Sequence, residues 1–314
     1  MEPSGEEDTL IAVLPFYHIY GMTVILNSAL SHGATVVCMS RFDLEQFLVL
    51  MQKHEVTRAH LVPPIVLALA KHPMVEGYAF PKLKTIMSGA APLGPELAED
   101  CARRLGCTVK QGYGLTETSP VTHLNPEPPG RVVPGSIGIC IPNTECRIVD
   151  YETGKDLGTG MQGELWIRGP QVMRGYLNNE EATNQTIDPE GWLKTGDIAE
   201  VDEDGYFKIV DRVKELIKYK GFQVAPAELE ALLLTHPSIA DCAVVPAEDP
   251  EAGEIPVGFV VYKENLVENP ETIMEFIAQK VSPQKKIRRI IQIEQIPKSP
   301  SGKILRRYLR DQIA

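Results

Sequence analysis

Residues Gln111 to Thr118, with the sequence QGYGLTET, combine the side chains needed to bind a phosphorylated ligand. The two glycines allow the backbone to approach a ligand closely, and the ring of Tyr113 can stack on a base. The hydroxyl of Thr116 beside the carboxylate of Glu117 can hold a phosphate and a magnesium ion. The residues alone leave open a second interpretation, in which the stretch is only a glycine-rich turn between a strand and a loop.

Two further stretches supply complementary groups. The segment Ser88 to Gly94 (SGAAPLG) ends the preceding predicted strand and offers a second wall of small residues. The carboxylate of Asp197, in GWLKTGD, can hold a ribose diol with two hydrogen bonds, and the guanidinium of Arg212 can support it. An ordinary salt bridge between this acid and this base is the alternative.

Cations gather in the last third of the chain. Lys214, Lys218 and Lys220 lie close to Gly221 in sequence, a pattern that either an anion-binding surface or a solvated face explains. Basic residues also outnumber acidic ones near the C-terminus, where the loop SPSGK presents Lys303. This local excess of positive charge suits a small polyanion better than a nucleic-acid duplex.

Composition excludes several other classes. With 31 Lys and Arg against 42 Asp and Glu, the formal charge of −11 disfavours nucleic acid and anionic membranes as partners. No apolar run is long enough for a membrane span, the first residues are acidic, and the six cysteines lack a CxxC pair. We therefore expect a cytoplasmic protein with reduced thiols. The seven histidines show no metal-binding spacing. The letters GTGMQG at 158–163 match GxGxxG but open no helix, so they do not predict a dinucleotide site.

The elements that must position these residues fall into three predicted parts, giving an α/β fold class. Residues 1–130 alternate short apolar runs, such as 84–89 and 109–114, with amphipathic helices, such as 42–54 and 95–106, which is typical of a parallel sheet covered on both faces. Residues 131–210 read as strands and turns of a small β-barrel. Residues 211–314 alternate helices and strands as a separate, mobile α+β domain.

In this order the motifs resemble those of the adenylate-forming superfamily, and most closely its 4-coumarate:CoA ligase-like acyl-CoA synthetases. The stretches that carry the resemblance are LPFYHIY (14–20), SGAAPLG, QGYGLTET, GWLKTGD, DRVKELIKYKGFQVAPAELE (211–230) and PKSPSGKILRR (297–307). The resemblance implies ATP-dependent conversion of a carboxylate to an acyl-AMP, followed by thioester formation with coenzyme A. It thus implies ATP, Mg²⁺ and CoA as cofactors and a small carboxylic acid as partner.

The resemblance also implies roles for individual residues. The catalytic group would comprise Lys303, Lys218, Thr116 and Glu117, with Glu117 on the metal. The AMP and ATP site would comprise Gly89, Ala90, Gln111, Gly112, Tyr113, Thr116, Asp197, Arg212, Lys214 and Lys303, with Lys214 at a hinge. The substrate-side residues would be His18, Tyr20, Val24 and Gln223. Arg41, Lys220 and Gly221 would contact CoA.

The chain departs from the family's pattern at its start, because the Ser/Thr/Gly-rich phosphate-binding loop does not precede Leu10. We therefore expect a fragment, a truncated gene model or one half of a split protein, whose partner would be an upstream half-chain completing the large domain. Such a chain should lack acid-dependent ATP–pyrophosphate exchange and still convert acyl-AMP slowly. The alternatives are a non-catalytic nucleotide-binding remnant, or a luciferase-like or peptide-synthetase-like adenylation activity. Tyr20, Val24 and the loop Val62-Pro63-Pro64 favour 4-coumarate or another aryl or fatty acid.

Overall fold

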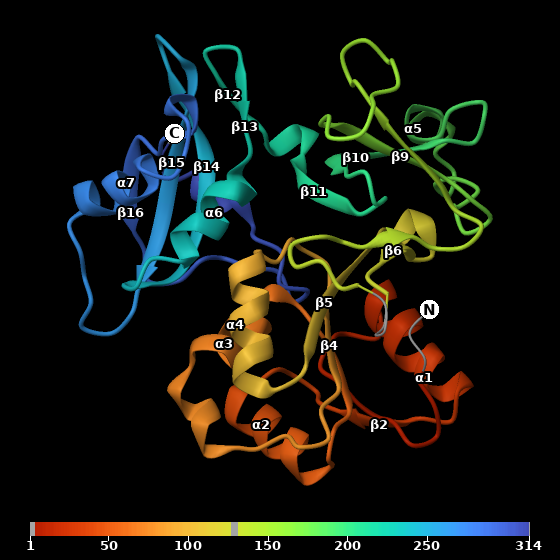
Figure 1. Cartoon of the computed structure of the whole chain (residues 1–314). Helices are drawn as coiled ribbons and strands as arrows, with labels where there is room; N and C mark the ends of the chain where they lie inside the picture. The colour runs from red at the N-terminus through yellow and green to blue at the C-terminus, as the bar shows by residue number, and fades with distance from the viewer. Residues whose placement is uncertain (1–3, 127–130, 314) are drawn as a thin grey trace. The chain divides into compact units, whose positions relative to one another are not determined.

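The computed structural model describes residues 4–126 and 131–313, which form two compact units (Figure 1). The first unit contains the described residues up to Thr195, together with residues 199–209 and 300–302. The second contains residues 196–198, 210–299 and the described residues from Lys303 onward. The three-part division at residues 130 and 210 stays a prediction, and residues 127–130 at its first boundary lie outside the described ranges.

A seven-stranded sheet organises the first unit. Its strands, in spatial order, are β2 (Thr35–Cys38), β1 (Thr9–Ala12), β3 (Arg58–Leu61), β4 (Thr85–Ser88), β5 (Thr108–Gly114), β6 (Val121–Leu124) and β7 (Ile139–Cys140). The strands from β2 to β5 are parallel, whereas β6 and β7 continue the sheet in antiparallel fashion. Because the four crossovers from β1 to β5 carry helices, the carboxyl ends of these strands share one edge.

Helices cover both faces of this sheet. Leu10 packs with Ala29 of α1 (Ser28–Ser31), whereas its neighbour Ile11 belongs to the core cluster that includes α2 (Leu44–Lys53), α3 (Pro63–Lys71) and α4 (Pro95–Leu105). Successive strand residues point to opposite faces, which explains this division. Figure 1 shows α3 and α4 side by side. The sequence indicated α2 and α4, but it did not indicate α3.

A smaller sheet belongs mostly to the first unit, although residues 196–198 and 210–212 of its strands are assigned to the second. Its order is β11 (Phe207–Arg212), β10 (Leu193–Val201), β9 (Gly163–Arg168) and β8 (Glu145–Val149), with β8 and β9 antiparallel. Along β9, buried and half-buried residues alternate, so that Leu165 and Ile167 enter an apolar cluster with Ile148. Helix α5 (Glu180–Thr186) connects β9 to β10 in this sheet. In the seven-stranded sheet, the π-helix η1 (Tyr20–Asn27) follows β1, and the short helices η2 (Pro73–Gly77) and η3 (Thr116–Thr118) precede β4 and β6.

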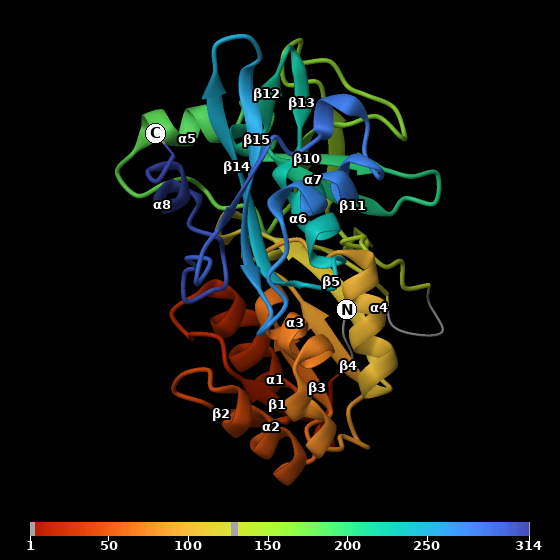
Figure 2. The same cartoon turned by 90° about the vertical axis from the view of Figure 1, so that its left-hand side faces the viewer.

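The second unit is an α+β module. Strands β13 (Phe222–Val224), β12 (Ile217–Tyr219), β15 (Gly253–Tyr262) and β14 (Ile239–Asp249) follow one another in the sheet, and β16 (Arg289–Gln292) pairs with β15. The helices are η4 (Val213–Glu215), α6 (Pro226–Leu234), α7 (Pro270–Ala278), η5 (Pro283–Lys285) and α8 (Arg306–Arg310). Figure 2 shows β14 and β15 as the two long neighbouring strands.

Alternation along β14 gives this sheet two apolar faces. Cys242 and Val244 point into the cluster that contains residues of α6 and α7, whereas Ala243 and Val245 point into the cluster that contains Leu309 of α8. The observed parallel sheet, smaller sheet and C-terminal α+β module confirm the predicted fold class. None of the helices in the described ranges has the length and apolarity needed to cross a bilayer.

Candidate functional site

The strand-end residues predicted to bind nucleotide lie next to one another. In the pairing of β4 with β5, Ser88 is opposite Gln111, so the turn that follows β4 starts beside the end of β5. Gly89 and Ala90 form that turn, and Ala90 adopts the left-handed conformation, with φ of 70°. A non-glycine residue in this region is uncommon and costs conformational energy, which the surrounding structure must offset. The carboxyl edge of an open parallel sheet is also where ligands of such folds bind.

The side chain of Gln111 holds this turn in place. It is buried, and its amide accepts a hydrogen bond from the backbone N–H of Leu93 at 2.8 Å and donates one to the carbonyl of Leu93 at 3.0 Å. Both ends of the amide are therefore occupied by the loop 89–94. The backbone carbonyl of Gln111 accepts from the side chain of Asn125 at 3.1 Å. Gln111 thus positions the predicted adenine-side loop through its side chain.

Tyr20 of η1 lies against the same turn. Its hydroxyl donates a hydrogen bond to the carbonyl of Met87 at 3.1 Å, and a Cβ placed on Gly89 would lie only 3.0 Å from its ring. His18 lies next to Tyr20, because Nδ1 of His18 accepts a hydrogen bond from the backbone N–H of Tyr20 at 3.2 Å. Val24 follows Tyr20 by four residues on the π-helix, which places both near one face. The structure therefore brings Tyr20 to the nucleotide-side turn, and His18 and Val24 lie close to Tyr20 along the chain.

A close backbone contact and one buried hydroxyl hold the loop that follows β5. A Cβ on Gly114 would lie 2.0 Å from the carbonyl oxygen of Pro120, so this close approach requires glycine. The hydroxyl of Thr118 accepts from the N–H of Leu115 at 2.9 Å and lies 2.5 Å from the carbonyl of Pro120. Thr116, by contrast, is exposed. Internal contacts therefore hold the base of this loop, whereas the side chain of Thr116 is open to solvent.

Glu117 has a partner that the sequence did not reveal. The hydroxyl of Tyr176 donates to Oε1 of Glu117 at 2.8 Å, and burial together with this bond raises the pKa of Tyr176. A hydrogen bond of this kind orients a carboxylate that ligates a metal. Magnesium typically takes one or two carboxylates and otherwise water and substrate phosphates. Glu117, with its second oxygen outside this hydrogen bond and the exposed hydroxyl of Thr116 beside it, fits that donor set.

In the second unit the predicted ribose residues form an ion pair. Nε of Arg212, at the end of β11, lies 3.4 Å from Oδ1 of the buried carboxylate of Asp197 on β10. The neighbouring Asp211 is buried and accepts from the N–H of Ala227, near the start of α6, at 2.8 Å. Burial raises the pKa of Asp211. Both interpretations of Asp197 and Arg212 are compatible with this geometry.

The predicted thioester-step residues face each other across a hairpin. Lys218 on β12 pairs directly with Gln223 on β13, and both side chains are exposed. The connecting residues Lys220 and Gly221 have φ of 47° and 81°, the two positive values that a two-residue type I′ turn demands. The N–H of Lys220 donates to the carbonyl of Ala252 at 2.8 Å, which ties the tip to the sheet.

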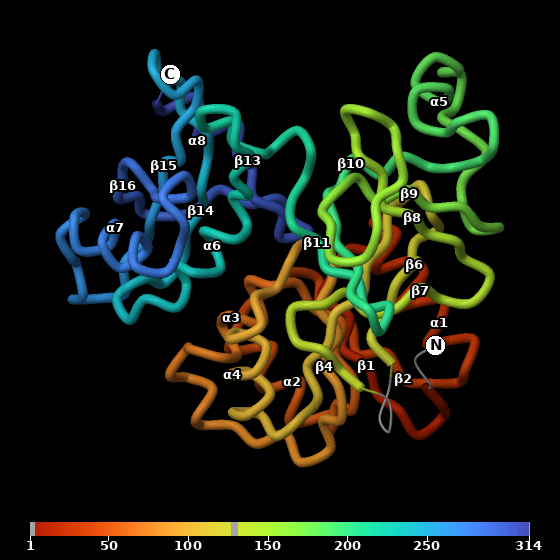
Figure 3. The backbone as a smooth tube through the Cα atoms, turned by 45° about the horizontal axis from the view of Figure 1, so that its top comes forward, coloured from red at the N-terminus to blue at the C-terminus, as the bar shows by residue number. Residues whose placement is uncertain are grey.

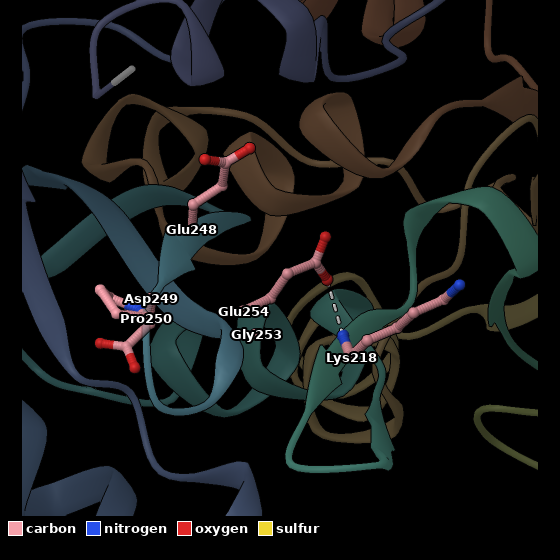
Figure 4. A pocket seen from close by; sticks show the side chains of 6 residues that line it. All are labelled: Lys218, Glu248, Asp249, Pro250, Gly253 and Glu254. Carbon is pink, nitrogen blue, oxygen red and sulfur yellow. Dashed lines mark hydrogen bonds between the residues drawn. The ribbon is translucent and has the colours of Figure 1, made fainter.

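A groove of about 640 Å³ adjoins this hairpin (Figure 4). Lys218, Glu254 and Glu248 line it together with Asp249, and the backbone N–H of Lys218 donates to Glu254 at 2.7 Å. In Figure 4 the side chain of Lys218 extends away from the three carboxylates. The acidic lining repels phosphate groups, so this groove is a poor binding site for a polyanion. The ammonium of Lys218 points out of the groove.

The loop that carries Lys303 is held at both ends. Lys298 pairs with Asp241 at 2.6 Å, and Nη2 of Arg306 contacts both oxygens of Glu230 at 2.7 and 2.9 Å. The Arg306 and Glu230 side chains are only 15% and 12% exposed. Between these anchors the N–H of Ser299 bonds the carbonyl of Lys303 at 2.8 Å, and the Lys303 side chain is exposed.

Two of the predicted residues lie apart from these groups. Arg41 follows β2, the edge strand, which β1, β3 and β4 separate from β5. At roughly 4.8 Å per strand this is a distance of about 19 Å across the sheet. Lys214 is exposed on η4, between β11 and β12. The roles of both residues stay predictions.

Comparison with known proteins decides the family. Residues 1–177 match the family described as AMP-binding enzyme, and residues 228–303 match the AMP-binding enzyme C-terminal domain. The chain belongs to the AMP-binding enzyme family. The longer match covers more than half of the chain and includes the residues described above in the first unit, from His18 to Tyr176.

Individual relatives agree with this assignment. The chain is 50% identical over 313 residues to 4-coumarate–CoA ligase 2 of Nicotiana tabacum and 52% identical over 312 residues to 4-coumarate-CoA ligase 2 of Narcissus pseudonarcissus. These matches cover 98% of the chain and 58% and 55% of the relatives, so the chain spans little more than half of their length. The crystal structure of ATP-bound MatB from Rhodopseudomonas palustris superposes with a TM-score of 0.90 at 29% identity, covering 98% of this chain and 60% of that one.

Sequence reasoning missed three contributors to the site. Tyr176 lies far along the chain from Glu117, in a stretch without a motif of its own. Arg306 and Glu230 are separated by 76 residues, and each resembles an ordinary surface charge in the sequence. A signal did exist for Arg306, because it follows the SPSGK loop by three residues within the basic segment. Its burial could not be inferred from that position.

Proposed function

We propose that the protein to which this chain belongs is an ATP-dependent acid:CoA ligase. It forms an acyl-AMP from a carboxylate and ATP, releasing pyrophosphate, and then transfers the acyl group to the thiol of CoA, releasing AMP. The observation that carries the proposal is the convergence of Gly89, Ala90, Tyr113 and the Thr116–Glu117 pair at the carboxyl ends of adjacent parallel strands. The relatives named 4-coumarate–CoA ligase support the same activity.

In the adenylation step, the strand-end residues bind and orient the nucleotide. Gly89 and Ala90 present backbone to the adenine side, with Gln111 fixing their loop, and Tyr113 offers an aromatic face to the base. Thr116 donates its hydroxyl to a phosphate oxygen, and Asp197 with Arg212 hold the ribose diol. Magnesium, when bound through Glu117, supplies charge neutralisation on the phosphates.

Charge development explains the use of a lysine in the same step. The attacking carboxylate and the α-phosphoryl oxygens are all negative, so a cation placed between them lowers the barrier most. Lys303 is suited to this role because its ammonium is a point charge on a flexible stem at an exposed loop tip. Lys218 and Gln223 act next, orienting the acyl-adenylate for attack by the CoA thiolate, with Lys220, Gly221 and Arg41 toward CoA.

The substrate proposed for this site is 4-coumarate or another aryl or fatty acid. Support comes from Tyr20, whose aromatic ring lies beside the turn of Gly89, and from Val24, an apolar residue one turn further along η1. The carboxylate end of such an acid would be near the nucleotide, and its apolar end would contact the η1 side chains. His18 lies at the start of the same segment.

The second half-reaction tests this function with the chain itself. Supplied with 4-coumaroyl-AMP and CoA, the chain should form 4-coumaroyl-CoA, detected by mass spectrometry. Lys218→Ala should reduce product to the level without protein, because the ammonium that orients the acyl-adenylate is lost. Lys208→Ala is the matched control, since Lys208 is likewise an exposed lysine on a strand. Absence of product with the unsubstituted, folded chain would favour a non-catalytic nucleotide-binding protein.

A further inference from the structure

Three side chains that ligate metals meet in the first unit and are used by none of the steps above. His123 of β6, Cys140 of β7 and Cys146 of β8 each offer one ligand atom, and these atoms all lie within 4.8 Å of one another. Sγ of Cys146 is 3.4 Å from Nε2 of His123 and 2.8 Å from Sγ of Cys140. Both cysteines are free and half-buried, whereas His123 is fully buried.

Strand pairing brings the three residues together. His123 is paired with Tyr113 of β5 on one side and with Cys140 of β7 on the other. The chain then reverses through a turn in which the N–H of Thr144 bonds the carbonyl of Ile141 at 3.2 Å, and Cys146 follows on β8. Figure 3 shows β6, β7 and β8 beside one another. The convergence is therefore a product of the fold, which explains why the spacing of the residues in the sequence gave no sign of it.

The hydrogen bonds around His123 favour Nε2 as the ligand atom. Its Nδ1 lies 3.0 Å from the hydroxyl of Thr122, and that hydroxyl lies 3.4 Å from the carbonyl of Tyr113. A hydroxyl that donates to the carbonyl accepts from Nδ1–H, which leaves the lone pair on Nε2, the atom that faces Cys146. A hydrogen-bonded second nitrogen of this kind is the usual support of a metal-binding histidine. The ring of Phe207, 4.5 Å away, holds the imidazole on its other side.

We propose that His123, Cys140 and Cys146 form a binding site for a thiophilic cation of the Zn²⁺ class. With Zn–S near 2.3 Å and Zn–N near 2.1 Å, tetrahedral coordination needs about 3.5 Å between sulfur and nitrogen and ~3.7 Å between the two sulfurs. The Cys146–His123 separation already meets the first requirement. The sulfurs must separate by about 1 Å, a change that a rotation of the half-buried Cys140 side chain can supply.

The donor set of the cluster suits a thiophilic cation. The two sulfurs lie 2.8 Å apart, close enough for both to bind one ion after a small side-chain rotation. Zn²⁺ binding would displace the thiol protons, so affinity should fall as the pH is lowered. With three protein ligands, the fourth position is left to water, so the ion should exchange with solvent more readily than at a four-ligand structural site.

Binding should stabilise the strand that carries the nucleotide-side residues, because His123 is the cross-strand partner of Tyr113. We would titrate the reduced full chain with Zn²⁺, and with Co²⁺ as a spectroscopic probe. The expected result is one ion per chain, thiolate-to-Co²⁺ charge-transfer absorption and a rise in the unfolding temperature with added Zn²⁺. Cys140→Ala and Cys146→Ala should each abolish the absorption and the stabilisation.

Two further variants make the test specific. Thr122→Val keeps the shape of a fully buried residue but removes the bond to Nδ1, and it should weaken Zn²⁺ affinity by about 10–100-fold. Cys38→Ser, at an exposed cysteine elsewhere in the chain, should change nothing. Circular dichroism of the metal-free variants checks that they fold. The proposal is overturned if the reduced chain binds no stoichiometric Zn²⁺, if Cys140→Ala binds it equally well, or if Cys140 and Cys146 form a disulfide that resists reduction and excludes the ion.

Discussion

The loop after β5 and the loop that carries Lys303 present their functional groups in opposite ways. The first is fixed internally, by the close contact of Gly114 with Pro120 and by the buried hydroxyl of Thr118. In the second, charged pairs of Lys298 and Arg306 hold the ends, bonds between Ser299 and Lys303 close the loop, and the side chain of Lys303 is exposed. A loop that recognises a nucleotide gains from rigidity, because binding then orders little, whereas a cation that must reach a developing charge gains from a movable tip.

The largest effect should come from removing an end anchor of the Lys303 loop. Arg306→Met leaves the carboxylate of Glu230 buried without its cation, and breaking a buried pair in this way typically costs ~3–5 kcal/mol. Urea unfolding monitored by circular dichroism would measure the loss. The double substitution Arg306→Met with Glu230→Leu is the control, since replacing both charges should recover most of the stability. An equal loss in the double variant would show that packing, and not charge, sets the effect.

The next largest effect concerns the tip itself. In a protein that spans the full length of the relatives, Lys303→Ala should lower the rate of acid-dependent ATP–pyrophosphate exchange by about 100–1,000-fold, because the cation proposed to stabilise the transition state is lost. The unfolding free energy should hardly change, since the Lys303 side chain is exposed. Thioester formation from supplied acyl-AMP should be affected far less. Equal losses in both half-reactions would contradict a role confined to adenylation.

Asp8 and its partners Thr57, Arg58 and Lys84 form a charged cluster near the amino ends of the parallel strands, away from the nucleotide-side residues. This cluster should affect stability but not nucleotide binding. Burial of Asp8 alone would raise its pKa, but hydrogen bonds from Lys84, Thr57 and Arg58 outweigh it and lower the pKa to about 2. A carboxylate with a depressed pKa stabilises the fold above its unfolded value near 3.8 and loses that contribution as the pH falls toward 2. Over this interval the contribution is about 2 kcal/mol.

Asp8→Asn should therefore unfold more easily than the unsubstituted chain at pH 6, and the difference should shrink between pH 4 and pH 2. Chemical denaturation across this range would measure it. Nucleotide affinity at pH 7 should stay within about twofold of that of the unsubstituted chain. The reason is that Asp8 lies before the amino end of β1, whereas Gly89 and Tyr113 lie at the carboxyl ends of their strands. A variant that loses nucleotide binding while remaining folded would show that this cluster, too, shapes the site.

The contrast between the loops also shows how far the sequence could lead. Strand β5 and helices α2 and α4 were predictable because their apolar residues recur with the period of each element. Helix α3 was missed because it begins at Pro63-Pro64 and continues a strand's apolar run, so its start resembles a loop. The sequence motifs identified Gln111 and Lys303. They did not reveal that Gln111 hydrogen-bonds the backbone of Leu93, or that Arg306 pairs with Glu230. The cluster of His123, Cys140 and Cys146 depends on strand register, which motifs do not contain.

The smallest expected effect compares one hydroxyl in each loop. Thr118→Val removes a buried hydroxyl that bonds both the N–H of Leu115 and the carbonyl of Pro120, and losing these two bonds should cost about 1–3 kcal/mol. Ser299→Ala removes an exposed hydroxyl that accepts from the N–H of Lys303 at 3.1 Å, where water can replace it, so the loss should be below about 1 kcal/mol. Thermal unfolding measures both. If the two losses were equal, the base of the nucleotide-side loop would be no more dependent on internal contacts than the Lys303 loop, and the distinction between a rigid and a movable loop would fail.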